Sequence, residues 1–166
     1  NTITEVKEIE SKGTGSSLLK YDEEIIYTTI NGVFAFITEQ QEFSKDSLLT
    51  SKFFDRDESI IGILKPTNNS EKIWGFTNDN IISVSPGLLS DAPQRIKIPI
   101  PNFFRRSMGI LGFESIVHLN DEVYLIGIAN GYVTLDLNKI KPQEYKITIN
   151  SISKEYYDAP DIGIKL

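Results

Sequence analysis

Cysteine is absent from this 166-residue sequence, and histidine occurs once, at His118. Without cysteine the chain forms no disulfide, no zinc–thiolate site and no thiol nucleophile. A single histidine excludes histidine-rich metal sites and leaves any Ser-His-Asp arrangement dependent on that residue. We interpret His118 as a strand-end side chain near solvent, with a catalytic base as the alternative. The sequence therefore predicts no metal, no cofactor and no catalytic residue.

Positive charge and long apolar runs are scarce as well. The chain has 17 Lys and Arg against 23 Asp and Glu, a formal net charge of −6, and its basic residues are spread along the sequence. A nucleic-acid partner needs a clustered basic surface, so we expect no direct contact with DNA or RNA. No run reaches the roughly 18 apolar residues of a membrane-spanning helix, so we expect no membrane contact by this segment.

The chain opens with "NTITEVKEIE", which contains neither Met nor an apolar signal core. This opening predicts a processed protein or a piece of a larger one. Helical periodicity is also nearly missing. A short helix is predicted only for residues 45–55, "KDSLLTSKFFD", and a loop with a 3₁₀ turn for residues 101–109, "PNFFRRSMG". Alternating runs typical of strands fill most of the remainder.

Hairpin signals recur at three places, the dipeptides Asn31-Gly32, Asp79-Asn80 and Asn130-Gly131. An Asn-Gly pair between strand-forming residues indicates a tight turn in which both residues take positive φ. The three dipeptides lie about 50 residues apart, a spacing that indicates a structural repeat. We assign them as structural turns.

Each hairpin has a strand-like run before and after it. The preceding runs are "SSLLKY", "SIIGILK" and "ESIVHL", and the following runs are Glu42-Phe43, "QRIKIPI" and "EYKITINSI". The repeating unit is therefore a four-stranded antiparallel meander, and the fold class is all-β. Repeated units of this kind are typical of β-propeller blades, and a β-sandwich is the alternative.

We predict about three four-stranded, propeller-like blades within residues 11–154, at about 17–55, 58–100 and 113–152. Propellers close with about four to eight blades, so these three are expected to form part of a larger β-propeller. Residues 1–10 are then the end of a preceding blade or a linker, and residues 155–166 an exit segment toward a following domain.

The third unit also resembles a known family. An aromatic residue and a glycine share the first hairpin strand (Trp74-Gly75, and Tyr124 with Gly127), the Asn-Gly turn follows, and "LDL" precedes a lysine. With these features residues 17–154 resemble the two-component-regulator propellers of Bacteroidetes sensor proteins. The second unit departs from the pattern by having Asp79-Asn80 at its turn.

This resemblance implies a periplasmic location within a membrane-anchored regulator. In the family a triple-tyrosine domain, a membrane helix and a cytoplasmic output follow the propeller, the output being a histidine kinase or a LuxR-type DNA-binding module. It also implies a possible glycan or other small ligand, and self-association through blade edges or the downstream domain. The expected function is that of a non-enzymatic sensor segment involved in transcription regulation.

The candidate ligand-binding residues are Phe103, Phe104, Arg105 and Arg106. They lie between two predicted blades, and arginine binds carboxylates through two parallel hydrogen bonds, so an anionic sugar is a suitable ligand. The alternative is that the phenylalanines fill the interface between blades while the arginines are solvated. Trp74, the single tryptophan, is predicted to pack between blades.

Two other functions remain open at this stage. One is a fragment of a propeller polysaccharide lyase or glycosidase, which requires paired acids, or His118 with a tyrosine or arginine. The acidic run at Asp55, Asp57 and Glu58 is interpreted as a solvated connection, with a catalytic or calcium site as the alternative. The other is a structural dimerisation module.

Overall fold

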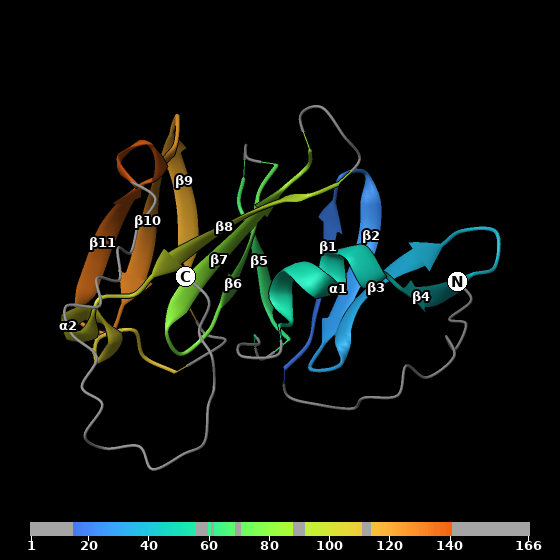
Figure 1. Ribbon diagram of the computed structural model, residues 1–166, viewed down its shortest axis with the longest axis horizontal. Coiled ribbons are helices and arrows are strands. Elements are labelled where there is room, and N and C mark those ends of the chain that lie inside the picture. The colour runs from blue at the N-terminus through green and yellow to red at the C-terminus, as the bar shows by residue number, and fades with distance from the viewer. Residues whose placement is uncertain are drawn as a thin grey trace, which may run out of the picture.

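The computed structural model describes residues 15–55, 60, 62–68, 71–87, 92–110 and 114–140. These residues form three antiparallel sheets that follow one another along the chain and lie side by side (Figure 1). Sheets 1, 2 and 3 have four, four and three strands, and in each sheet sequence neighbours pair with one another. The meander predicted from the sequence is confirmed, as is the predominance of β structure.

Sheet 1 contains β1 (Ser17–Tyr21), β2 (Glu24–Thr29), β3 (Gly32–Ile37) and β4 (Glu42–Lys45). Sheet 2 contains β5 (Leu64–Pro66), β6 (Ile73–Phe76), β7 (Asn80–Ser85) and β8 (Gln94–Pro99). Sheet 3 contains β9 (Ile116–Asn120), β10 (Val123–Ile128) and β11 (Gly131–Asp136). The predicted fourth strand of the third unit, and residues 1–10 and 155–166, lie outside the described residues.

The described residues also form three short helical segments that connect or follow the sheets: α1 (Ser47–Phe53), α2 (Asn102–Arg105) and the 3₁₀ segment η1 (Leu137–Lys139). The helix predicted within residues 45–55 is confirmed. It begins where the side chain of Asp46 accepts a hydrogen bond of 2.9 Å from the Leu49 backbone N–H, which satisfies a donor that the helix itself leaves unpaired. The described sheets form no closed ring, so the larger propeller stays a prediction.

The predicted Asn-Gly turns are displaced by one residue. The two-residue connection of β2 and β3 is Ile30-Asn31, and Gly32 is the first residue of β3, with φ 135°. Gly131 likewise opens β11, with φ 156°. Neither Asn31 nor Asn130 has positive φ, so that part of the prediction is wrong. A turn of ordinary hand followed by a glycine of positive φ is another common way to close a hairpin.

The second hairpin differs from the prediction in the same manner. Asn80 is the first residue of β7, so the connection runs from Thr77 to Asp79, and neither Asp79 nor Asn80 has positive φ. The hydroxyl of Thr77 accepts a hydrogen bond of 2.9 Å from the Asn80 backbone N–H and so holds the connection closed. Paired positive φ occurs instead between β1 and β2, at Asp22 (48°) and Glu23 (64°).

Sheet 2 is covered on both faces. All four residues of β6 and the first five of β7 are buried. Because successive side chains of a strand point to opposite faces, an unbroken buried run requires a covering layer on each side. Sheet 1 with α1 covers one face, and sheet 3 covers the other.

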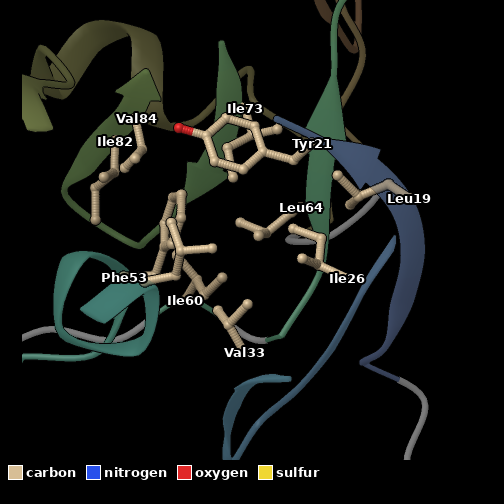
Figure 2. Packing of buried hydrophobic residues seen from close by; sticks show 11 residues of the cluster. Leu19, Tyr21, Ile26, Val33, Phe53, Ile60, Leu64, Ile73, Ile82 and Val84 are labelled. Carbon is tan, nitrogen blue, oxygen red and sulfur yellow. The ribbon is translucent and has the colours of Figure 1, made fainter. Parts of the chain in front are cut away.

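The joint between sheets 1 and 2 is an aliphatic and aromatic cluster. Sheet 1 and α1 contribute Leu19, Tyr21, Ile26, Val33, Leu49 and Phe53, which pack with Ile60 on the residues of sheet 2, namely Leu64, Ile73, Ile82 and Val84. Figure 2 shows the Tyr21 ring extending across the cluster on the side of Val84. Burial raises the pKa of Tyr21 above its usual value, and the negative charge of Asp22 adds to the shift.

The joint between sheets 2 and 3 is built around Trp74. The tryptophan is fully buried, and its ring meets that of Tyr124 edge-on at a centroid distance of 4.7 Å. The cluster continues through Phe76, Ile81, Ile98, Ile100, Ile116 and Ile126. The prediction that Trp74 packs between consecutive units is confirmed.

The residue after Trp74 is a glycine, Gly75, and α1 approaches β6 too closely at this point to leave room for a larger side chain. A Cβ atom at this position would lie 2.7 Å from Cγ2 of Ile60 and 3.0 Å from Cδ1 of Phe53. Such distances are too short for unstrained contact in a close-packed interior. The Trp-Gly pair thus serves both joints, with Trp74 facing sheet 3 and Gly75 admitting the helix on the opposite face.

Replacing Trp74 by alanine is expected to lower the free energy of unfolding by about 3–5 kcal/mol, because it leaves a large cavity between sheets 2 and 3. Chemical denaturation at a fixed protein concentration measures the change. Ile110, which is 75% exposed, provides the control, since Ile110→Ala is expected to change stability by less than about 0.5 kcal/mol. Equal effects of the two substitutions would contradict the assignment of Trp74 as the centre of the joint.

Gly75→Ala is expected to destabilise the chain by about 1–3 kcal/mol, because the added methyl group overpacks the contact with α1. In the Ile60→Ala background the nearest conflicting atom is gone, so the cost of Gly75→Ala should fall. A double-mutant cycle measured by denaturation tests this coupling. Additive effects would show that the cost arises from the backbone and not from the contact.

Candidate functional site

The predicted ligand-binding residues lie on α2 and just after it, between sheets 2 and 3. Phe104 packs against the cluster around Trp74 and lines an apolar groove of about 330 Å³ with Ile100 and Ile126. Arg105 directs Nη2 to Oδ1 of Asp79 at 2.8 Å, and Arg106 is exposed. The side chain of Phe103 lies outside the described part of the structure. Phe104 therefore already packs against the protein, and Arg105 already forms an ion pair. The ligand-binding role of both residues stays a prediction.

The other charged run considered from the sequence is only partly described. Asp55 lies 3.7 Å from Nη1 of Arg95, an arginine of β8, whereas Asp57 and Glu58 are outside the described residues. The pairing links the end of α1 to sheet 2. Within the described ranges, no group of three or more histidine and carboxylate side chains is placed to hold a metal ion.

A polar cleft of about 590 Å³ lies between sheets 2 and 3 and is the candidate site. Residues of the β5–β6 and β9–β10 connections line it, and these connections lie near the upper edge of the sheets in Figure 1. We call it the inter-sheet cleft. The residues used below are Lys72, Gln94, His118, Glu122, Tyr124 and Asn138.

Lys72 and Glu122 join the two walls of the inter-sheet cleft. Nζ of Lys72, which precedes β6, lies 2.8 Å from Oε1 of Glu122, which precedes β10. Burial of Lys72 opposes its charge, but the hydrogen bond to Glu122 and the interactions with Tyr124 outweigh this, so the pKa of Lys72 is raised above 10.5. The lysine is therefore held as a cation between a carboxylate and a phenol.

His118 lies beside the same tyrosine. The His118 and Tyr124 rings are 5.1 Å apart between centroids, and Nε2 of His118 lies 2.8 Å from the carbonyl oxygen of Asp121. A carbonyl oxygen only accepts hydrogen bonds, so Nε2 is the protonated nitrogen and, in the neutral ring, Nδ1 is the free acceptor. His118 is half-buried, in keeping with its interpretation as a strand-end side chain.

A second hollow of about 300 Å³ adjoins the cleft and shares Glu71 and Lys72 with it. It is bounded on the other side by the β1–β2 turn, including Asp22 and Glu23. The first turns of all three units therefore gather along one rim of the sheets. This rim carries carboxylates, the partly buried ammonium group of Lys72 and exposed amides.

Four residues of the cleft were not predicted from the sequence, namely Lys72, Glu122, Gln94 and Asn138. A signal was present for the first two: each directly precedes the second strand of its unit, in consecutive units, with opposite charge. Equivalent positions of neighbouring repeats lie close together when the repeats stack. Opposite charges there indicate a contact across the joint.

No family model, curated protein or solved structure matches this chain. Among the described residues there is also no helix long and apolar enough to cross a membrane.

Replacing Lys72 by methionine is expected to cost about 1–2 kcal/mol, because the substitution leaves the partly buried carboxylate of Glu122 without its partner. Since the pKa of Lys72 is raised in the folded protein, its contribution is fully present below pH 10.5 and is lost as the pH rises through the raised value. Denaturation of both proteins across this range measures the difference.

Lys139 provides the control, since it pairs with Asp136 at 2.9 Å on the surface and is 83% exposed. Lys139→Met is expected to change stability by less than about 0.5 kcal/mol. A stability difference between wild type and Lys72→Met that stays constant through the titration of Lys72 would contradict the ion pair as its cause.

Proposed function

We propose that the chain is a run of blades from a larger β-propeller and serves as a non-enzymatic, ligand-binding segment of an extracytoplasmic sensor. The observation that supports the blades is the covering of sheet 2 on both faces by its neighbours in sequence. Meanders that stack in sequence order, each covering the next, are how blades are arranged. The periplasmic location and the downstream kinase or DNA-binding output rest on the family resemblance alone.

The inter-sheet cleft supports the binding role. Its exposed amides, Gln94 and Asn138, offer both donors and acceptors, while His118 adds a ring face. Lys72 and Glu122 neutralise each other, which leaves the carboxylates of Glu71 and Asp121 as the other charged groups of the lining. A small polyhydroxylated ligand such as a sugar suits these groups, because it needs several hydrogen bonds and an apolar ring contact but no net countercharge.

A second candidate function has one observation in its favour. One arrangement that would suit the lyase alternative is a histidine with a tyrosine in one cleft, and His118 and Tyr124 both line the inter-sheet cleft. However, Tyr124 is 1% exposed and interacts with Lys72, so its hydroxyl is turned to the protein instead of a substrate. The arrangement favours binding over catalysis.

Titration of the 166-residue chain with neutral and uronic-acid oligosaccharides, followed by NMR chemical shifts, tests this function. Saturable shifts at the cleft residues are expected, and Gln94→Ala should weaken the affinity about tenfold through loss of one hydrogen bond. Lys97→Ala, an exposed substitution on the same strand but outside the cleft, is the control.

Absence of saturable binding for every sugar tested would overturn the ligand-binding proposal. Conversion of a uronic-acid oligosaccharide to an unsaturated product, abolished by His118→Ala, would establish the lyase alternative instead. The two readouts are independent, because binding is observed by chemical shift and turnover by product formation.

A further inference from the structure

At both joints one face of a sheet packs on the opposite face of the sheet that follows it, and the same pair of faces is used each time. The second residue of the third strand in each unit faces the next sheet: Val33 belongs to the cluster between sheets 1 and 2, and Ile81 to that between sheets 2 and 3. The third residue faces the preceding sheet, as Ile82 and Val133 do. We call these the leading face and the trailing face of a sheet.

This rule identifies two faces that have no covering sheet among the described residues. They are the trailing face of sheet 1, which includes Phe34, and the leading face of sheet 3, which includes Tyr132. Both positions are occupied by apolar residues in the covered sheets, and both carry aromatic residues here. The stack of sheets therefore has two different ends, each shaped like one half of a joint.

The trailing face of sheet 1 is rich in aromatic residues. Cross-strand pairing aligns Leu18 with Tyr27 and Tyr27 with Phe34, and it aligns Phe36 with Phe43. The Phe43 ring lies 5.7 Å from that of Tyr27 and 5.2 Å from that of Phe36. On the same face Leu18 is 65% exposed and Ile25 is 47% exposed. Apart from Lys20, opposite Ile25, and Lys45, opposite Phe34, these residues are apolar, and an exposed apolar face is typical of an interaction surface.

The leading face of sheet 3 combines apolar residues with Thr134 and Asp136, which pair with Leu125 and Val123. Val117 pairs with Leu125, and Tyr132 lies opposite Gly127 on the same face. Val117 and Tyr132 are 55% and 70% exposed. In sheets 1 and 2 the equivalent face is buried by the sheet that follows. A chain that presents both halves of its own internal joint can repeat that joint with another copy of itself.

We propose that two copies of this chain associate head-to-tail, the leading face of sheet 3 in each copy packing on the trailing face of sheet 1 in the other. The proposal rests on the blade arrangement proposed above. Two copies supply six sheets, which lies within the range of about four to eight at which propellers close, whereas three copies supply nine. A head-to-tail contact that closes gives a ring, and one that does not close gives a growing assembly.

The solution mass of the full chain, measured by size-exclusion chromatography with light scattering, is the primary test. The expected value is twice the 18.7 kDa of one chain. A monomer would overturn the proposal, and so would an assembly that grows with concentration, because it would mean that the joint does not close on two copies.

Two double variants separate the faces. Leu18→Lys with Ile25→Lys blocks the trailing face of sheet 1, and Val117→Lys with Tyr132→Lys blocks the leading face of sheet 3. Each is expected to be monomeric by itself, since its remaining face lacks a partner. An equimolar mixture is expected to dimerise more weakly than the wild type. One joint forms because each variant carries the intact face that the other has lost, whereas the second joint would bring the two blocked faces together. Circular dichroism confirms that both variants are folded, which these exposed positions should permit.

Ile110→Lys, at an exposed position on neither face, is the matched control and should remain dimeric. Dimerisation by the variant blocked at sheet 3 would show that sheet 1 pairs with itself and would overturn the head-to-tail contact. The outcome is independent of the ligand test: a monomer that still binds sugar in the inter-sheet cleft would overturn only the dimer, and a dimer that binds none would overturn only the ligand role.

Discussion

Burial of sheet 2 on both faces is the constraint on which the rest of the structure depends. Strands β6 and β7 present apolar side chains on both sides, so neither face of the sheet tolerates water. Sheet 1 and α1 cover one side and sheet 3 covers the other, through the clusters around Phe53 and Trp74. The positions of the turns, the inter-sheet cleft and the open end faces all follow from this stacking.

The polar groups lie where the stacked sheets end. At one edge Lys72 and Glu122 connect sheets 2 and 3, and at the β6–β7 connection Asp79 holds Arg105 of α2. These pairs lie outside the apolar clusters, so they orient the segments that they join more than they drive association. The candidate site is therefore a product of the joint: its walls come from two units and neither unit contains it alone.

Much of the fold could be predicted because it depends on local alternation and on spacing. The three hairpins, the short helix at Ser47–Phe53 and the inter-unit position of Trp74 were all predicted. The turn conformations were not, since Asn31 and Asn130 lack the positive φ that their dipeptides indicate. The register of a hairpin is determined by cross-strand pairing along both strands, and that pairing moved each glycine into the following strand.

The sequence by itself determined that the chain forms repeated antiparallel meanders, because strand alternation and turn residues act over a few positions. It also determined the absence of disulfides and thiol chemistry. Only the tertiary structure decided which face of each sheet packs on which neighbour. This packing brings Lys72 to Glu122 and Arg105 to Asp79, where they form ion pairs. Those contacts join residues distant along the chain or on different segments, and their geometry arises only when apolar faces pack together.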